Sequence, residues 1–263
     1  MLELNGKAAV VTGASSDDGI GSECAKILAS RGCNVVVNYA TNKAGGEKIA
    51  EACRVAGADA VAVQGDVSKN EDCERLVKAC IDKWGRLDVL INNAATTKPI
   101  PHKRMDLLDA AEFERIFSVN VIGTYQMTRA AAPHLKATGD AAIVNISSVG
   151  AMRAGGSSMA YTASKAAINN LTLSTARALA PEVRVNALCP GGMLGRWTRK
   201  ILTEEQYQER LKEADRVYPL KRGIWPVDVA VAALFLVEGA TTMTGEAIRM
   251  DCGQHLGETS TRT

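Results

Sequence analysis

In this chain of 263 residues, the segment AAVVTGASSDDGIG, Ala8 to Gly21, gives the clearest indication of the fold. It begins as an apolar, partly β-branched run without alternation, as expected of a strand whose two faces are both covered. It then enters a turn with Gly13, Gly19 and Gly21 in the spacing G-x5-G-x-G, and a helical pattern follows. A strand that passes through a glycine-rich turn into a helix indicates a parallel α/β fold.

The same alternation continues along the chain. Strands are predicted at 8–13, 34–39, 59–65, 87–93, 141–147, 183–189 and 247–251, and helices near 21–32, 43–56, 69–84, 112–137, 159–180 and 227–237. Ser68-x-x-Glu71 predicts a capping box at the third helix, and Thr203-x-x-Gln206 predicts a further helix start. Right-handed crossovers then give a Rossmann-type doubly wound parallel sheet of about seven strands, with helices on both faces. No linker or repeat divides the sequence, so we expect residues 1–263 to form one domain.

The composition indicates an ordinary globular protein. A formal net charge of +2 provides no broad field for nucleic acid or an anionic membrane, so we expect neither as a partner. The apolar run 229–237 is far shorter than the roughly 20 residues that span a bilayer. Without a basic leader at the N-terminus, the cytoplasm is the expected location. Seven cysteines without a C-x-x-C pair are interpreted as reduced apolar filler, and the three histidines show no metal spacing.

The glycine-rich turn lies where α/β sheets bind ligands, beyond the carboxyl ends of the strands. Glycines there let the backbone approach a pyrophosphate, which sits against the N–H groups of a helix N-terminus. The loop alone is also compatible with a plain βα turn. The candidate phosphate contacts are Gly13, Ser15, Ser16, Gly19, Ile20 and Gly21.

The end of the second predicted strand indicates the choice of nucleotide. The acidic residue that would hold a ribose 2′-hydroxyl is replaced by Asn38, which Tyr39, Thr41 and Lys43 follow. With no carboxylate to repel a 2′-phosphate, NADP(H) is preferred. NAD(H) remains possible, because Asp17 and Asp18 in the loop disfavour a nearby phosphate.

A second group of residues contains the candidates for catalysis. Tyr161 and Lys165 stand four residues apart on a predicted helix, hence on one face, and Ser148 ends the strand before them. Asn120 falls within the long helix 112–137. With TG…GIG, GDV (65–67) and NNAA (92–95), the chain resembles the short-chain dehydrogenase/reductase family from about residue 5 to residue 254. It looks most similar to the branch of 3-oxoacyl-carrier-protein reductases.

The resemblance implies a mechanism for hydride transfer between a nicotinamide and a carbonyl or secondary alcohol. Tyr161 would exchange the proton with the carbonyl oxygen, and Ser148 would hydrogen-bond that oxygen. Lys165 would bind the nicotinamide ribose and, as a nearby ammonium, lower the pKa of the phenol from its ordinary value of about 10. Asn120 would anchor a water that passes protons to Lys165.

The resemblance also implies the remaining contacts. Asp66 and Val67 would meet the adenine, with helix entry as the alternative role of Asp66, and Asn93 and Ala94 would lie along the cofactor. Pro190 and Gly191 would flank the nicotinamide. The segment 193–220 would cover the substrate, either as a mobile lid with an apolar side or as a helix packed on the core. Similar proteins pair their long helices across a homotetramer, which is the assembly expected here.

The sequence departs from the family pattern in its glycine loop, which is two residues longer than TGxxxGxG. Enoyl-carrier-protein reductases share that length but usually separate their catalytic Tyr and Lys by six residues. Because Tyr-Lys spacing reports on chemistry, a carbonyl reductase is the better interpretation. Two alternatives stay open: an enoyl-thioester reductase-like activity, and a non-catalytic NADP-binding sensor. Arg196, Arg199 and Lys200 could contact an acidic carrier protein or form a solvated basic patch.

Overall fold

Seven parallel strands form one sheet in the computed structural model, which describes residues 3–195, 198–199 and 202–257. Their order is β3-β2-β1-β4-β5-β6-β7. The order reverses between β1 and β4, and such a switch point opens a crevice at the carboxyl ends of the strands. The strands are β1 (Ala8–Val11), β2 (Asn34–Tyr39), β3 (Ala60–Gln64), β4 (Val89–Asn92), β5 (Ala141–Ile146), β6 (Val183–Pro190) and β7 (Ala247–Met250).

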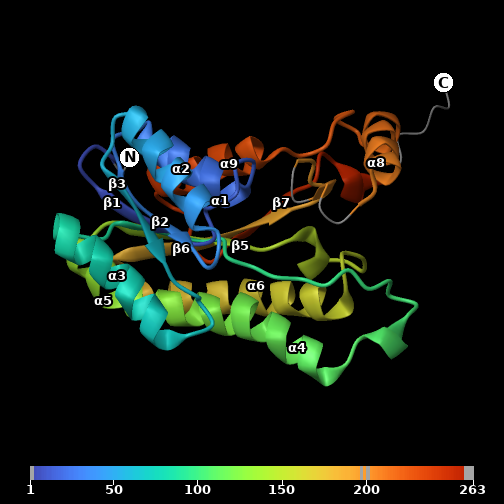
Figure 1. Cartoon of the computed structure of the whole chain (residues 1–263), viewed down its shortest axis with the longest axis horizontal. Coiled ribbons are helices and arrows are strands. Elements are labelled where there is room, and N and C mark those ends of the chain that lie inside the picture. Colours follow the sequence, from blue (N-terminus) through green and yellow to red (C-terminus); the bar gives the residue numbers. More distant parts are fainter. Residues whose placement is uncertain (1–2, 196–197, 200–201, 258–263) are drawn as a thin grey trace.

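Helices cover both faces of the sheet (Figure 1). On one face lie α1 (Ile20–Ala29), α2 (Lys43–Val55) and α9 (Pro226–Glu238). On the other lie α3 (Asn70–Trp84), α4 (Ala110–Phe117), α5 (Gly123–Thr138) and α6 (Met159–Leu179). The helix α8 (Glu204–Val217) stands apart from both layers, beyond the carboxyl ends of the strands. The doubly wound parallel fold expected from the sequence is confirmed.

The strand sequences explain the two cores. Successive side chains of a strand point to opposite faces, and both faces are buried here. In β1, Ala9 and Val11 join the core beneath α1 and α9, whereas Ala8 and Val10 join the core beneath α3 and α5. An uninterrupted apolar run is therefore what this sheet requires.

Two local expectations were wrong. The pattern 112–137 is not one α-helix, because a π-helical turn (Ser118–Ile122) separates α4 from α5. Ser68 does not cap α3; its hydroxyl donates to Asp66 Oδ1 at 2.7 Å, and the helix begins after Lys69 without a side-chain cap. The second capping box is confirmed, since the Thr203 hydroxyl accepts from the Gln206 N–H at the start of α8.

The cysteines behave as apolar filler. All seven are free, and six are buried. Burial raises the pKa of Cys24 and of Cys80 to about 12, which keeps these thiols protonated.

Candidate active site

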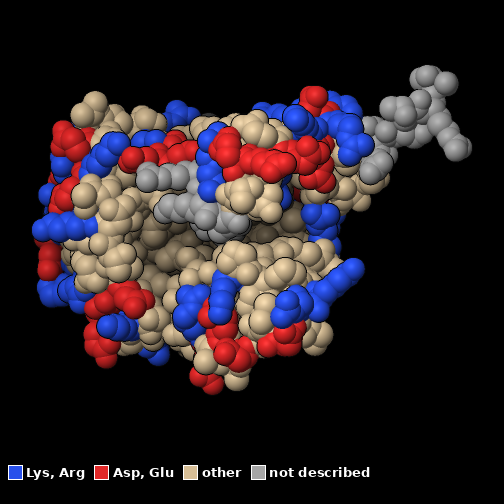
Figure 2. Space-filling view, turned by 45° about the vertical axis from the view of Figure 1, so that its right-hand side comes forward, with Lys and Arg blue, Asp and Glu red and all other residues tan. Residues whose placement is uncertain are grey.

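A cavity of about 1130 Å³ runs along the carboxyl ends of β1 to β6. Figure 2 shows a hollow in this face of the molecule, where Lys and Arg side chains are interspersed with Asp and Glu. Gly21, Tyr39 and Asn120 are not among the described residues that line the cavity. The other sequence candidates do line it: Gly13, Ser15, Ser16, Gly19, Ile20, Asn38, Thr41, Asp66, Val67, Asn93, Ala94, Ser148, Tyr161, Lys165, Pro190 and Gly191.

The glycine loop is fixed against the end of β4. Gly13 has φ +63°, and a Cβ there would lie 2.8 Å from Ala94 Cα. The amide of Asn93 donates to Thr12 O at 2.9 Å and to Gly13 O at 3.0 Å. A Cβ on Gly21 would lie 2.5 Å from the same amide nitrogen. Gly21 therefore stands behind the loop, where it leaves room for the side chain that holds the loop in place.

The lengthened part of the loop contacts α2 and its N-cap residue. Lys48 Nζ lies 3.0 Å from Asp17 Oδ2, and Asn42 Nδ2 donates to Ser15 O at 2.7 Å. A Cβ on Gly45 would lie 2.1 Å from Ser15 O, so only glycine permits this approach. The two additional residues thus extend the loop toward the N-terminus of α2 and leave the first turn of α1 facing the cavity.

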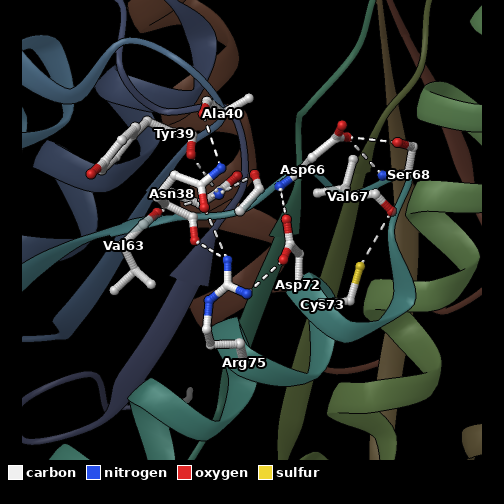
Figure 3. A network of polar contacts seen from close by, with 12 residues as sticks. Asn38, Tyr39, Ala40, Val63, Asp66, Val67, Ser68, Asp72, Cys73 and Arg75 are labelled. Carbon is white, nitrogen blue, oxygen red and sulfur yellow. Dashed lines mark hydrogen bonds and ion pairs between the residues drawn. The ribbon is translucent and has the colours of Figure 1, made fainter.

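The side chain of Asn38 connects the end of β2 to the segments that follow β1 and β3, and Figure 3 shows its surroundings. Its Oδ1 accepts from Gly13 N at 3.0 Å, while its Nδ2 donates to Gly65 O at 2.9 Å. The side chain is 1% exposed, so its amide serves the backbone of the protein more than a ligand. The ring of Tyr39 packs against Gly46 of α2. At the end of β2, the cavity is lined instead by Ala40, Thr41 and Asn42.

Asp66 and Val67 follow β3 and are held by α3, as Figure 3 shows, and also by α5. Asp66 Oδ1 accepts from the Ser68 N–H and hydroxyl, and Asp66 N donates to Asp72 Oδ2 at 2.8 Å. This backbone hydrogen bond is the main reason why the pKa of Asp72 is lowered. Val67 O accepts from Gln126 Nε2 at 2.9 Å. Asp66 thus lines the cavity from a turn that these hydrogen bonds hold in place.

The three central candidates converge at the middle of the cavity. Ser148 follows β5, and its Oγ accepts from Gly150 N at 3.1 Å. Tyr161 and Lys165 lie in the first two turns of α6, whose N-cap Ser158 accepts from Tyr161 N at 3.3 Å. Lys165 Nζ lies 5.5 Å from the centroid of the Tyr161 ring and donates to Ile146 O at 2.7 Å. Ser148 hydrogen-bonds Tyr161, so a phenol, a hydroxyl and an ammonium share one site.

Asn120 supports this site from behind. It is fully buried; its Oδ1 accepts from Thr96 N at 2.8 Å and its Nδ2 donates to Ser164 Oγ at 2.9 Å. Ser164 precedes Lys165 on α6, and Thr96 lines the cavity. The side chain therefore positions neighbours of the site, and the water-anchoring role stays a prediction.

Comparison with known proteins agrees with this geometry. A family described as enoyl-(acyl carrier protein) reductase matches residues 13–255. A protein from Streptomyces violaceoruber, described as a ketoacyl reductase of the granaticin polyketide synthase, is 41% identical over 94% of this chain and 96% of its own. The chain belongs to the short-chain dehydrogenase/reductase family.

Solved structures of other short-chain dehydrogenase/reductases have the same fold. One from Burkholderia xenovorans superposes with a TM-score of 0.87 at 40% identity, covering 95% of this chain and 98% of the other. A 7α-hydroxysteroid dehydrogenase complexed with NADH and 7-oxo glycochenodeoxycholic acid gives a TM-score of 0.86 at 29% identity, covering 95% of each chain. This short-chain dehydrogenase/reductase is therefore an oxidoreductase.

The pKa expected for Tyr161 was wrong in direction. Burial raises it to about 12, and the hydrogen bond with Ser148 only partly offsets this effect. Burial also lowers the pKa of Lys165 to about 8, against the opposing effect of Cys189. The ammonium is directed at Ile146 O, and both groups lose hydration, so desolvation outweighs the attraction that was expected. At neutral pH both groups are protonated.

The residues fit a dinucleotide. Gly13 and Gly21 have no room for a Cβ because they pack against Ala94 and Asn93, and this packing fixes the backbone of the loop beside the cavity. The N-terminus of α1 begins at Ile20, which lines the cavity, and unpaired N–H groups there favour an anion. Pro190 and Gly191 line the far part, where Gly191 N donates to Met250 O at 2.6 Å.

Among its described residues, the segment 193–220 places part of its apolar side at the cavity and buries another part. Met193, Leu194 and Leu202 line the cavity, but Tyr207 is fully buried and stacks 4.2 Å beneath Arg199. From α8 the cavity is lined by Gln206, Arg210 and Glu213. Arg196, Trp197, Lys200 and Ile201 lie outside the described residues, so the proposed contact with a carrier protein is not tested.

Sequence reasoning missed several residues of the cavity. Gln206, Arg210 and Glu213 follow the spacing i, i+4, i+7, and this helical face could have been found from that pattern. Arg153 stands five residues after Ser148, but nothing in its local sequence separates it from a solvated cation. The missed residues that line the cavity include Ala40, Gly65, Thr96, Arg153, Ser157, Gln206, Arg210, Tyr218 and Gln254.

Within the described ranges, no helix is long and apolar enough to cross a membrane. In the same ranges, no group of three or more His, Cys, Asp or Glu side chains could hold a metal ion.

Proposed function

We propose that the protein is a carbonyl reductase that uses NADP(H) in preference to NAD(H) and acts on a ketone, with 3-oxoacyl thioesters among its substrates. The observation that carries the proposal is that Ser148, Tyr161 and Lys165 face the same cavity as the glycine loop. A nucleotide bound between the loop and Pro190 would lie in the cavity that all three side chains line. Such a convergence of proton donor and cofactor site is what hydride transfer needs.

The chain's own residues supply everything except the hydride, which a bound nicotinamide nucleotide supplies as it is oxidised. Tyr161, protonated at neutral pH, donates its proton to the carbonyl oxygen as the carbon accepts the hydride. Ser148 Oγ accepts from Gly150 N, and its hydroxyl would donate to the carbonyl oxygen in place of Tyr161. The Lys165 ammonium stabilises the phenolate that forms. One carbonyl, one hydride and one proton give one secondary alcohol.

A substrate panel tests this function. NADPH oxidation is measured with acetoacetyl and trans-2-enoyl thioesters of N-acetylcysteamine, diketones and quinones. We expect turnover of carbonyl compounds and none of the enoyl thioesters, because the Tyr-x3-Lys spacing differs from that usual in enoyl reductases. Turnover of enoyl thioesters alone would establish the activity that the matched family description names. Tight NADPH binding without any turnover would favour the sensor.

The cofactor preference makes a second prediction. Thr41 is exposed at the end of β2 and lines the cavity, so Thr41→Asp places a carboxylate where a 2′-phosphate would lie. We expect kcat/KM for NADPH to fall about tenfold or more through charge repulsion. The value for NADH should change little, since its ribose carries no phosphate.

The matched control is Thr41→Val, which removes the hydroxyl without adding charge and should keep the preference for NADPH. Two results would contradict the proposed 2′-phosphate site. One is a clear preference of the wild-type protein for NADH, and the other is a Thr41→Asp variant whose kcat/KM values for both cofactors are unchanged.

We further propose a homotetramer. Ile122, Tyr125 and Leu173 are exposed apolar residues near or on the long helices α5 and α6, and Val231 and Phe235 are exposed on α9. Such residues suit contacts between copies of this chain. The assembly and the cytoplasmic location stay predictions.

A further inference from the structure

We propose that the substrate carries an oxyanion, a carboxylate or a phosphate, which Arg210 and Arg153 bind at the lid end of the cavity. The inference rests on the proposed function, because it names the substrate class of the same site. It makes the protein a reductase of anionic carbonyl compounds, with neutral ketones as poorer substrates.

The helix α8 presents a polar face to the cavity. Gln206, Arg210 and Glu213 line it, whereas the apolar residue Tyr207 is fully buried elsewhere in the lid. A cover built for an apolar substrate would turn its apolar side inward. This helix instead turns inward the amide of Gln206, the permanent cation of Arg210 and the carboxylate of Glu213. The apolar part of the lining comes from the chain before the helix, from Met193, Leu194 and Leu202.

Arg210 has unused capacity to bind. Its Nε is buried and has no hydrogen-bond partner, and no ion pair of its guanidinium occurs among the described residues. A guanidinium keeps its charge at any physiological pH and matches the geometry of a carboxylate or phosphate. Because leaving a buried donor unsatisfied is costly, an oxyanion from the substrate is a fitting partner.

Arg153 reaches the same region from the loop after Ser148. It donates to Gln254 Oε1 at 2.5 Å, and Gln254 Nε2 donates to the Tyr218 hydroxyl at 3.1 Å. Tyr218 is 2% exposed, and a Cβ on Gly192 would lie 2.5 Å from its hydroxyl oxygen. The chain of contacts therefore runs from Arg153 to the segment that follows β6, beside the proposed nicotinamide site.

The charges of both arginines act at Tyr218. Burial raises the pKa of this phenol, and Arg210 and Arg153 oppose that effect, whereas Glu213 adds to it. Glu213 also lines the cavity, but it is exposed and makes no ion pair with either arginine in the described part of the chain. The other acidic residues of the cavity, Asp18 and Asp66, lie on the loops that follow β1 and β3. At the end of the cavity beneath the segment 193–220, the two cations Arg210 and Arg153 therefore outnumber the single carboxylate, Glu213.

Paired substrates test the inference. Methyl-ketone carboxylates with two to six methylene groups are compared with their primary amides, and acetoacetyl-4′-phosphopantetheine is compared with acetoacetylpantetheine. We expect at least one of these anions to have a kcat/KM about tenfold or more above that of the neutral partner of the same length. The two arms distinguish a carboxylate from a phosphate.

Arg210→Gln and Arg153→Gln should abolish that difference, chiefly by raising KM for the anion, while kinetics with the neutral partner change less than about twofold. Arg216→Gln is the matched control, because Arg216 lies on the same helix, is exposed and is not among the cavity residues. Equal kinetics of wild-type protein with both partners, or equal losses for both in Arg210→Gln, would overturn the inference.

A binding measurement separates this inference from the proposed function. Calorimetry with NADP⁺-loaded protein compares hexanoate with hexanamide, neither of which can be reduced at a ketone. Binding of hexanoate that Arg210→Gln weakens about tenfold supports the anion site, even if no ketone is turned over. Reduction of neutral ketones without discrimination would leave the proposed function intact and refute the anion site.

Discussion

Tyr161→Phe will lower kcat for carbonyl reduction by about 10²- to 10⁴-fold, because the variant retains the ring but has no proton to donate. The phenol hydroxyl is hydrogen-bonded to Ser148 and holds its proton at neutral pH, its pKa being raised to about 12. The affinity for NADP⁺ should change little, since the glycine loop and the end of β2 are untouched. Single-turnover kinetics and equilibrium binding of NADP⁺ give the two quantities.

Tyr125→Phe provides the matched control. Tyr125 lies on α5, is 46% exposed and is not among the cavity residues, so its hydroxyl should be dispensable. A Tyr161→Phe variant with wild-type kcat would show that another group supplies the proton, and the mechanism would have to be abandoned.

Gly21→Ala will weaken NADP⁺ binding by about thirtyfold. The added Cβ would lie 2.5 Å from Asn93 Nδ2, which must then give up its bonds to Thr12 O and Gly13 O. Two neutral hydrogen bonds at about 1 kcal/mol each correspond to that factor. Fluorescence titration of the folded variant with NADP⁺ or NADPH measures it.

Gly57→Ala controls for strain alone. Gly57 has φ +103°, so alanine there is also strained, but its Cβ would meet nothing within 4 Å. That variant should lose some stability and keep its affinity for NADP⁺. Unchanged affinity in folded Gly21→Ala would mean that the loop does not depend on Asn93 for its shape.

The sheet was readable from the sequence because burial on both faces makes each strand a short apolar run. The predicted ranges 34–39 and 141–147 differ from β2 and β5 by one residue at most. The break between α4 and α5 was not readable. A π-helical turn leaves the helical spacing of apolar residues in the sequence unchanged, so the pattern does not reveal it. The close approach of Gly123 to Val67 is a tertiary contact, which the local sequence does not show either.

The site was readable where chemistry demands a residue type at a fixed spacing. Tyr161 and Lys165 share a helix face in any structure that contains the helix. Asn38 shows the limit, because an amide that faces a ribose and one that binds three backbone segments look identical in sequence. The raised pKa of Tyr161 could not be foreseen either, since it depends on how much water the folded chain removes from the hydroxyl.

The lengthened glycine loop contacts the segment that covers the substrate, and this contact bears on the order of events in a catalytic cycle. A Cβ on Gly195 would lie 3.0 Å from Asp18 Oδ2, so the loop touches the start of the segment that covers the substrate. Because this contact joins the loop to the segment over the substrate, a nucleotide bound at the loop would influence how that segment lies on the substrate. We therefore expect the nucleotide to bind before the carbonyl substrate and to leave after the alcohol, which product-inhibition kinetics can check.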